Sequence, residues 1–352
     1  MGFSFVAMHR MCEREKNKFS PEEIVGMVFV SDGRALSDEE LIEKLKSFGI
    51  DINKATFLQM VKRFSSAEEM FYWYINQEHP QVKLTHGIHD DWIWTCLVVL
   101  WERWAPDQPS FEMLDDLIQN GYDLLMQIDY SELGNNQEEG CEMWLKAWAW
   151  ILKIMDERNF KTIDDFDNNF KGTQYISNWV QDLEMELWNA GQDDSKYLKA
   201  RIKFTGEYIK RFPFEDKHIL QNMKKAFAET HFKLGKTKKT ASLFEEWLEE
   251  DPQWGWGWIG YSDCYWLDFK EKQDFKKGEE ILKRGLDVPG VEDQDDIIDR
   301  LINLYEESDR PDEAEKWSAL LPPPAPMPFL GEISKVKHLI PSKKKRKKKK
   351  KK

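Results

Sequence analysis

The chain has 352 residues, a formal net charge of −13 at neutral pH and 33% charged residues. Its mean hydropathy is −0.67, and we find no apolar run of the 18 residues or so that a membrane helix requires. The most apolar stretch, from Trp92 to Trp101, is too short and is flanked by Asp90, Asp91 and Glu102. We therefore expect no membrane span.

The chain's cysteines are far apart in the sequence and form no C-x-x-C pair: they are Cys12, Cys96, Cys141 and Cys264. Such spacing is typical of reduced, mostly buried thiols rather than of a disulfide framework. The N-terminal segment also lacks the apolar core and cleavage site of a signal peptide. We expect a cytoplasmic protein.

Helix-start signals recur in the first 70 residues. Ser20, Ser37 and Ser66 each precede a glutamate by three residues, the arrangement of a capping box. The helix after Ser37 should end at Gly49. Apart from a weak run at Met27 to Val30, we find no alternation of period two, and the fold class expected is all-α.

Residues 90–160 predict three long helices, joined by connections at 105–110 and 130–137. Stripes of large apolar residues recur at helical spacing in them, and several are tryptophans. Packing in a core explains these side chains best, with an aromatic binding groove as the alternative. Residues 37–63 could also form a helix-turn-helix, but Lys54, Lys62 and Arg63 alone make a weak recognition helix.

From about residue 194 the chain repeats itself. Pro213, Pro252, Pro289 and Pro326 fall at intervals of 39, 37 and 37 residues, and each of the first three follows an amphipathic helix. Periods of this length are typical of stacked helical hairpins. In the clearest unit, Phe227, Ala228 and His231 lie on one helix, Gly235 marks the turn, and Phe244 and Trp247 lie on the next. Ala228, Gly278 and Ala314 stand where paired helices should approach closely.

This succession of a large residue, a small residue, an aromatic, a second small residue and a closing proline resembles the tetratricopeptide repeat. The resemblance covers roughly residues 195–320. It departs from the family pattern at Thr240 and Ser262, where a small residue is usual, and the third unit carries about four extra residues. The resemblance implies a degenerate α-solenoid that holds a protein or peptide segment in a groove.

The stretch from Pro252 to Trp266 is also similar to the last repeats of bacterial cytosolic proteins that end in a SEC-C zinc-binding tail. That tail needs a cysteine cluster after a lysine-rich linker, and no cysteine follows Cys264 here. No zinc site can therefore be carried over from the resemblance.

The C-terminal end changes character twice. Residues 321–342 begin with a proline-rich linker, and residues 343–352 are all basic. Such a block stays solvated and disordered, and can bind nucleic acid or ribosomes without sequence preference. It also resembles a nuclear import signal, which would place the protein in the nucleus of a eukaryotic cell, and it could instead neutralise the chain's own acidic body. The polyanion-binding candidates are Lys343, Lys344, Lys345, Arg346, Lys347 and Lys348.

Two clusters could carry metal chemistry. His79, His86 and His89 precede two aspartates, which would more simply cap the following helix. The acidic run of residues 292–299 lacks the glycine of a calcium loop and suits the first turn of a helix.

We find no phosphate-binding loop and no nucleophile elbow. We expect no enzyme, no cofactor and no metal, with an unrecognised site near His86 or Asp91 as the contrary possibility.

The densest aromatic patch supplies the partner-groove candidates, which are Trp254, Trp256, Trp258, Tyr261 and Tyr265. Most should pack inside the hairpins, and those left over would line a groove.

The sequence thus predicts an N-terminal helical region over 1–190, repeats over 191–320, a linker over 321–342 and a tail over 343–352. The predicted function is a non-enzymatic scaffold that binds a protein or peptide. Because the body of the chain is acidic, it should favour basic partners. The alternative is a factor tethered to nucleic acid by its tail.

Overall fold

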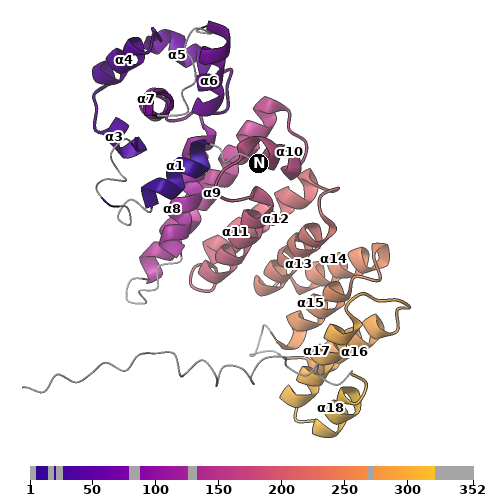
Figure 1. Ribbon diagram of the computed structural model, residues 1–352. Coiled ribbons are helices and arrows are strands. Elements are labelled where there is room, and N and C mark those ends of the chain that lie inside the picture. Colours follow the sequence, from indigo (N-terminus) through magenta and orange to yellow (C-terminus); the bar gives the residue numbers. More distant parts are fainter. Residues whose placement is uncertain are drawn as a thin grey trace, which may run out of the picture. The chain divides into compact units, whose positions relative to one another are not determined.

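A computed structural model describes residues 5–14, 20, 27–78, 88–125, 133–267 and 273–321 (Figure 1). Within these ranges the chain forms helices and turns and no strand, which confirms the all-α prediction. The chain divides into two compact units, Met1–Glu249 and Glu250–Lys352, called unit 1 and unit 2 below.

Unit 1 contains two groups of helices. The first group is α1 (Phe5–Arg14), α3 (Val30–Arg34), α4 (Asp38–Ser47), α5 (Lys54–Met60), α6 (Ala67–Trp73), the π-helical turn η2 (Tyr74–Glu78) and α7 (Ile88–Trp104). The second group is α8 (Phe111–Leu125), α9 (Leu133–Arg158), α10 (Ile163–Phe170), α11 (Ile176–Ala190), α12 (Ser195–Arg211), α13 (Lys217–Lys233) and α14 (Thr237–Glu250).

Local capping explains where the early helices begin and end. The Ser37 hydroxyl accepts a hydrogen bond from the Glu40 amide, and the Glu40 carboxylate accepts one from the Ser37 amide, so the predicted capping box is confirmed. The Ser66 hydroxyl likewise accepts a hydrogen bond from the Glu69 amide and caps α6. The Glu69 carboxylate accepts from the Ser65 amide and not from that of Ser66, so the predicted capping box is only half formed there. Gly49 follows α4 with a φ of +83°, which glycine adopts without strain. The helix predicted to begin after Ser20 falls on residues 21–26, outside the described residues.

The α7-centred cluster forms the first core of unit 1. Every residue of α7 from Ile93 to Trp101 is buried, and α3, α4 and α6 pack around it (Figure 1). A helix that is apolar all round its circumference must be enclosed in this way. Gly33 lets α3 approach closely, because a Cβ there would overlap the Thr95 side chain.

The layered helices α8 to α13 form the second core. Packing runs from α8 to α9, from α9 to α11, from α11 to α12 and from α12 to α13 (Figure 1). Trp144 and Trp179 meet edge to face in this core, with ring centroids 5.8 Å apart. The Trp144 indole donates to the Ile118 carbonyl, and Gly121 leaves room for that ring.

The structure confirms two expectations for residues 90–160 and corrects two others. The three long helices are confirmed as α7, α8 and α9, and Trp94, Trp101, Trp144 and Trp148 are buried as core residues. The connection expected at 130–137 is too long, because α9 already begins at Leu133. Likewise α7 begins at Ile88, so the aspartates at 90 and 91 lie inside the helix and do not cap it.

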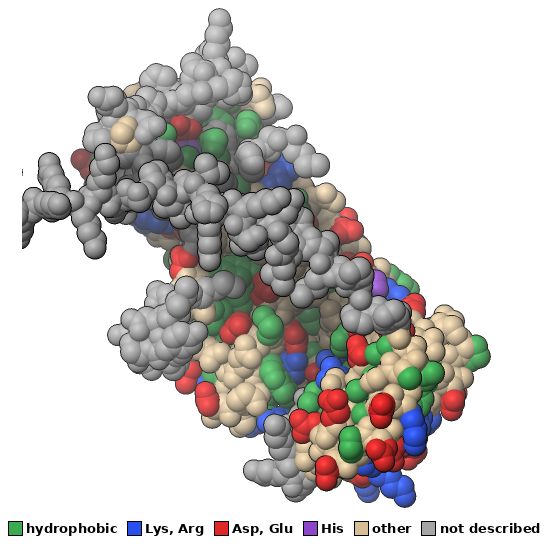
Figure 2. All heavy atoms as spheres, turned by 60° about the horizontal axis from the view of Figure 1, so that its bottom comes forward, with side chains coloured by type: hydrophobic (Ala, Val, Ile, Leu, Met, Phe, Trp, Pro, Cys, Tyr) green, Lys and Arg blue, Asp and Glu red, His purple; other side chains and the backbone are tan. Residues whose placement is uncertain are grey.

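Unit 2 consists of α15 (Gly255–Trp266), α16 (Phe275–Leu286), α17 (Gln294–Glu307) and α18 (Pro311–Ser318). Consecutive helices pack together, and α15 also packs on α17. Gly278 lies where a Cβ would overlap Trp266, which confirms a close approach there. Asp295 and Asp296 occupy the first turn of α17, as expected of the acidic run. Acidic and basic side chains are interspersed on the face of unit 2 that Figure 2 brings forward.

The sequence predicts a boundary near residue 190, where α11 ends. In the structure α12 and α13, which follow it, pack with α11 and belong to unit 1. Among the described residues we find no helix long and apolar enough to span a bilayer.

Candidate functional site

A groove runs between α9 and α12 in unit 1. Its volume is about 670 Å³. The α9 side is formed by residues from Leu145 to Glu157 and the α12 side by residues from Ala200 to Arg211. At 1.5 Å per residue, these stretches make the groove roughly 17 Å long.

The two sides of the groove define what it can hold. A helix lying along the groove would run beside α9 and α12 for about 17 Å. One face of such a helix would direct apolar side chains into the groove.

The groove has a rigid aromatic floor. Trp148 and Phe204 are buried and meet edge to face, with ring centroids 5.0 Å apart. The Trp148 indole donates a hydrogen bond of 3.0 Å to the Glu207 carboxylate, so its polar atom is satisfied. Leu145, Leu152 and Ala200 flank these rings and are only partly buried. A partner could bury this apolar surface without leaving the indole unpaired.

Charged side chains of both signs form the rim. Arg211 pairs with Asp156 across the groove at 2.5 Å. The Lys153 ammonium donates to the Asp107 carbonyl and to the Gln108 side chain. An apolar floor with a polar rim is the usual anatomy of a protein interaction site.

The groove follows from two apolar stripes on α9. One stripe contains Trp144, Ile151 and Ile154 and faces the core, where all three are buried. The helical spacing of these residues in the sequence predicts this stripe. A second stripe, with Leu145, Ala149 and Leu152 at helical spacing, lies to one side and faces the groove. Two offset stripes on one helix are the sequence signal that could have indicated the groove.

The predicted aromatic patch lies on and beside α15. Trp254, Trp258 and Tyr261 are buried, Tyr265 is partly buried, and Trp256 is 42% exposed. The Trp258 indole donates to the Pro252 carbonyl at 2.9 Å, and its ring covers Gly285. Trp256 is therefore the member of the patch most open to a partner, followed by Tyr265.

The other predicted sites fall mostly outside the described residues. These are the basic tail with Lys343, Lys344, Lys345, Arg346, Lys347 and Lys348, the proline-rich linker beyond Leu321, and the side chains of His79, His86 and His89. Asp91 is described and lies 3.2 Å from the ring of His9. No three histidine, cysteine or acidic side chains converge as metal ligands in the described ranges.

Comparison of the chain with protein-family profiles, with curated proteins and with solved structures finds no match.

Proposed function

We propose that the protein is a non-enzymatic scaffold that binds a helical segment of a partner protein in the groove between α9 and α12. The observation that carries the proposal is the set of partly buried apolar side chains beside the buried rings of the floor, which are Leu145, Leu152 and Ala200. Charged side chains border them. Helix-in-groove recognition uses such surfaces, with apolar anchors that recur along one face of the bound helix.

The proposed occupant is an amphipathic helix of three or so turns. About 17 Å of groove corresponds to about 11 residues of helix, which places three apolar anchors at helical spacing over the floor. Basic residues on the outer face of this helix would suit the chain's net charge of −13, which attracts basic partners over long range.

The tetratricopeptide-like organisation belongs to the same proposal. It is supported by consecutive helices that pack together within each unit, which are α11, α12 and α13 in unit 1 and α15, α16, α17 and α18 in unit 2. Close contacts at small residues such as Gly278 also support it. Repeats of this kind stack hairpins and present extended surfaces to peptides. A cytoplasmic location is also part of the proposal, and it rests on the four cysteines, which are far apart in the sequence and form no disulfide.

One substitution in the groove tests the function. Ala149 is exposed on the α9 side, so Ala149→Arg places a long charged side chain over the floor without disturbing the core. Ala55, exposed on α5, provides the matched control Ala55→Arg. Partners captured by the full chain would be cross-linked through lysines, since Lys153 and Lys203 stand on opposite sides of the groove.

The decisive measurement uses the partner segment that those cross-links identify. As a synthetic peptide, it should bind the unmodified chain and Ala55→Arg equally, and Ala149→Arg at least tenfold more weakly. Equal binding by all three proteins would show that the groove is not the site.

A nucleic-acid-associated role is the second proposal, and the ten consecutive basic residues at 343–352 favour it. Deleting them should abolish binding to a random RNA at low salt and leave binding of the groove peptide unchanged. RNA binding that survives the deletion would contradict this role.

A further inference from the structure

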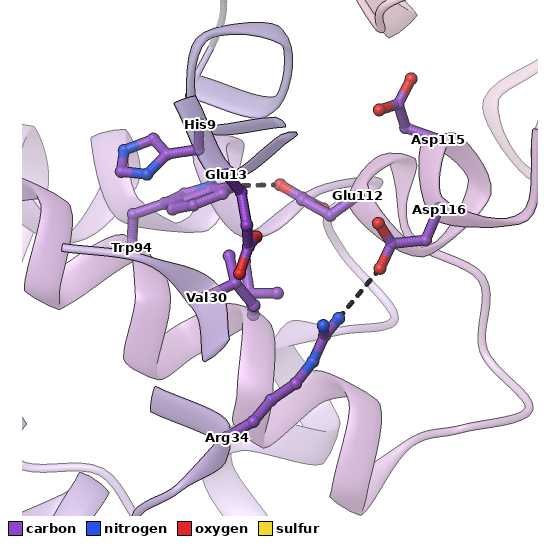
Figure 3. Close-up of a pocket in the computed structure, with 9 residues that line it drawn as sticks. His9, Glu13, Val30, Arg34, Trp94, Glu112, Asp115 and Asp116 are labelled. Carbon is purple, nitrogen blue, oxygen red and sulfur yellow. Dashed lines mark hydrogen bonds and ion pairs between the residues drawn. The ribbon is translucent and has the colours of Figure 1, made fainter. Parts of the chain in front are cut away.

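A small polar cavity lies between α1, α3, α7 and α8 (Figure 3). Its volume is about 30 Å³, which is room for about two water-sized groups. Val30, Trp94 and Val98 supply apolar walls, and all three are buried. The more exposed side chain of Arg34 stands at the edge of the cavity.

Glu112 lines the cavity and is 4% exposed. One of its carboxylate oxygens accepts hydrogen bonds from the Glu68 amide at 3.0 Å and from the Trp94 indole at 3.4 Å. The other oxygen, Oε2, is buried and has no hydrogen-bond partner among the described residues. A buried carboxylate oxygen without a donor is costly, so this atom indicates a missing donor group.

Three further carboxylates line the cavity, those of Glu13, Asp115 and Asp116. In Figure 3 the carboxylates of Glu13 and Asp116 lie on either side of the space between Glu112 and Arg34. The Asp115 carboxylate accepts hydrogen bonds from the amide and hydroxyl of Thr173. Glu13 accepts a hydrogen bond from the Ser31 amide, and Asp116 pairs with Arg34 at 2.9 Å. The Glu13 carboxylate keeps acceptor capacity beyond this bond, because an ionised carboxylate can accept about four hydrogen bonds. Asp116 adds a second negative charge beside the cavity.

The chemistry of the cavity narrows the class of ligand. An anion would meet three carboxylates at close range. No three of the described histidine, cysteine or acidic side chains stand close enough together to hold a metal ion at metal–oxygen distances of about 2.0–2.6 Å. An ammonium reaches its acceptors at the longer N···O distance of about 2.7–3.2 Å. A guanidinium is planar and has five donors, more than a cavity of about 30 Å³ accommodates. A primary ammonium is water-sized and has three donors, and its aliphatic stem suits apolar walls.

We propose that this cavity binds a primary ammonium group, which donates hydrogen bonds to Glu112 Oε2, Glu13 and Asp116 while its aliphatic stem lies against Val30 and Val98. The proposed site is distinct from the groove between α9 and α12 and does not depend on the proposed function. The shared chemistry is that of a free alkylamine and of a lysine side chain on a partner protein.

The charges around Glu112 make binding depend on pH. Burial raises the pKa of Glu112 to about 7, although amides that donate to it act in the opposite direction. An ammonium favours the ionised carboxylate, so binding should release a proton near neutrality and strengthen from pH 6 to pH 8. The other charged or titratable groups that line the cavity are His9 and Glu13 on α1, Arg34 on α3, and Asp115 and Asp116 on α8. Glu68 and Glu69 lie in the first turn of α6, whose Glu68 amide donates to Glu112, and Asp91 on α7 pairs with His9.

Calorimetry with the full chain tests the proposal. The ligands are n-butylammonium chloride and the lysine derivative Nα-acetyl-lysine N-methylamide, at ionic strength matched with sodium chloride. Butylguanidinium is the control for shape. We expect butylammonium to bind and butylguanidinium not to bind, with proton release that appears as different heats in two buffers. Binding by the capped lysine as well would identify a lysine side chain as the natural ligand, and its exclusion would identify a free amine.

Variants then locate the site. Glu112→Gln and the more exposed Glu13→Gln should each weaken butylammonium binding at least tenfold, while Glu139→Gln on the exposed side of α9 should leave it unchanged. Proton release by the unmodified chain needs no variant, so the proposal remains testable even if Glu112→Gln fails to fold. Absence of binding at millimolar concentrations, or binding that both cavity variants retain, would overturn the proposal and leave a water-filled cavity.

Discussion

The α7-centred cluster and the layered helices use the same kind of residue for different ends. α7 and α9 are both rich in tryptophan. The buried run of α7 from Ile93 to Trp101 is covered on all sides, whereas α9 is covered on one side and keeps a second, partly exposed apolar stripe. Tryptophan content by itself therefore does not indicate a binding groove. What matters is how far round the helix the apolar residues extend, and whether neighbouring helices cover all of them.

The largest effect should come from opening the closed cluster. Trp101 is fully buried, donates a hydrogen bond to the Gln108 carbonyl and meets the Phe57 ring. Trp101→Ala should lower the free energy of unfolding by about 3–5 kcal/mol, measured by urea denaturation. Trp256→Ala removes a tryptophan that is 42% exposed and should cost much less. Equal losses would mean that burial does not distinguish the two tryptophans.

The Glu112 carboxyl should make the free energy of unfolding depend on pH. The pKa of Glu112 in the folded chain is about 7, against an ordinary value of 4.5. The folded state therefore holds the proton longer, and stability falls as pH rises from 4.5 through 7. With 1.36 kcal/mol per pKa unit, the loss is about 3 kcal/mol. Thermal unfolding between pH 5 and pH 8 should show this slope in the unmodified chain and a much flatter one in Glu112→Gln.

The layered helices contain a buried group of the opposite sign. Burial is the main cause that lowers the pKa of His231 to about 4, with Lys239 and Lys236 adding to it. The unfolded chain then binds the proton first, so stability is full above pH 6.5 and falls by roughly 2–3 kcal/mol toward pH 4. His231→Gln should remove this part of the acid sensitivity. The exposed His218 is the control, and an unchanged slope in His231→Gln would contradict the assignment.

Packing between α8 and α9 should be sensitive to a single methyl group. A Cβ at position 121 would overlap the Trp144 indole, so Gly121→Ala should cost about 1–3 kcal/mol despite alanine's higher helix propensity. A double-mutant cycle checks the cause. In a Trp144→Leu background the penalty should shrink, and a penalty that stays constant would place the strain elsewhere.

The groove itself should tolerate substitution. Ala149 is exposed, so Ala149→Arg should change the free energy of unfolding by less than about 0.5 kcal/mol while it blocks the partner helix. Chemical denaturation beside the peptide-binding assay separates the two effects. A loss of several kcal/mol would show that Ala149 belongs to a closed core. The α9 stripe would then be as fully covered as α7.

The amino-acid sequence by itself determined where many helices begin and end, because capping depends on groups within about four residues of one another. The Ser37 and Ser66 caps, Gly49 and the acidic first turn of α17 are of this kind. It also indicated that the tryptophans of residues 90–160 form a core, because their helical spacing places them on shared faces.

Tertiary packing determines which apolar stripe of α9 stays partly exposed to solvent and which carboxylate is buried. The groove needs α9 and α12 at a particular separation, and no local pattern sets that distance. Glu112 meets the amide of Glu68, 44 residues earlier, and the indole of Trp94 on a third helix. Burial is a sum of contacts between distant parts of the chain, so the sequence could name the residues of these sites but not their surroundings.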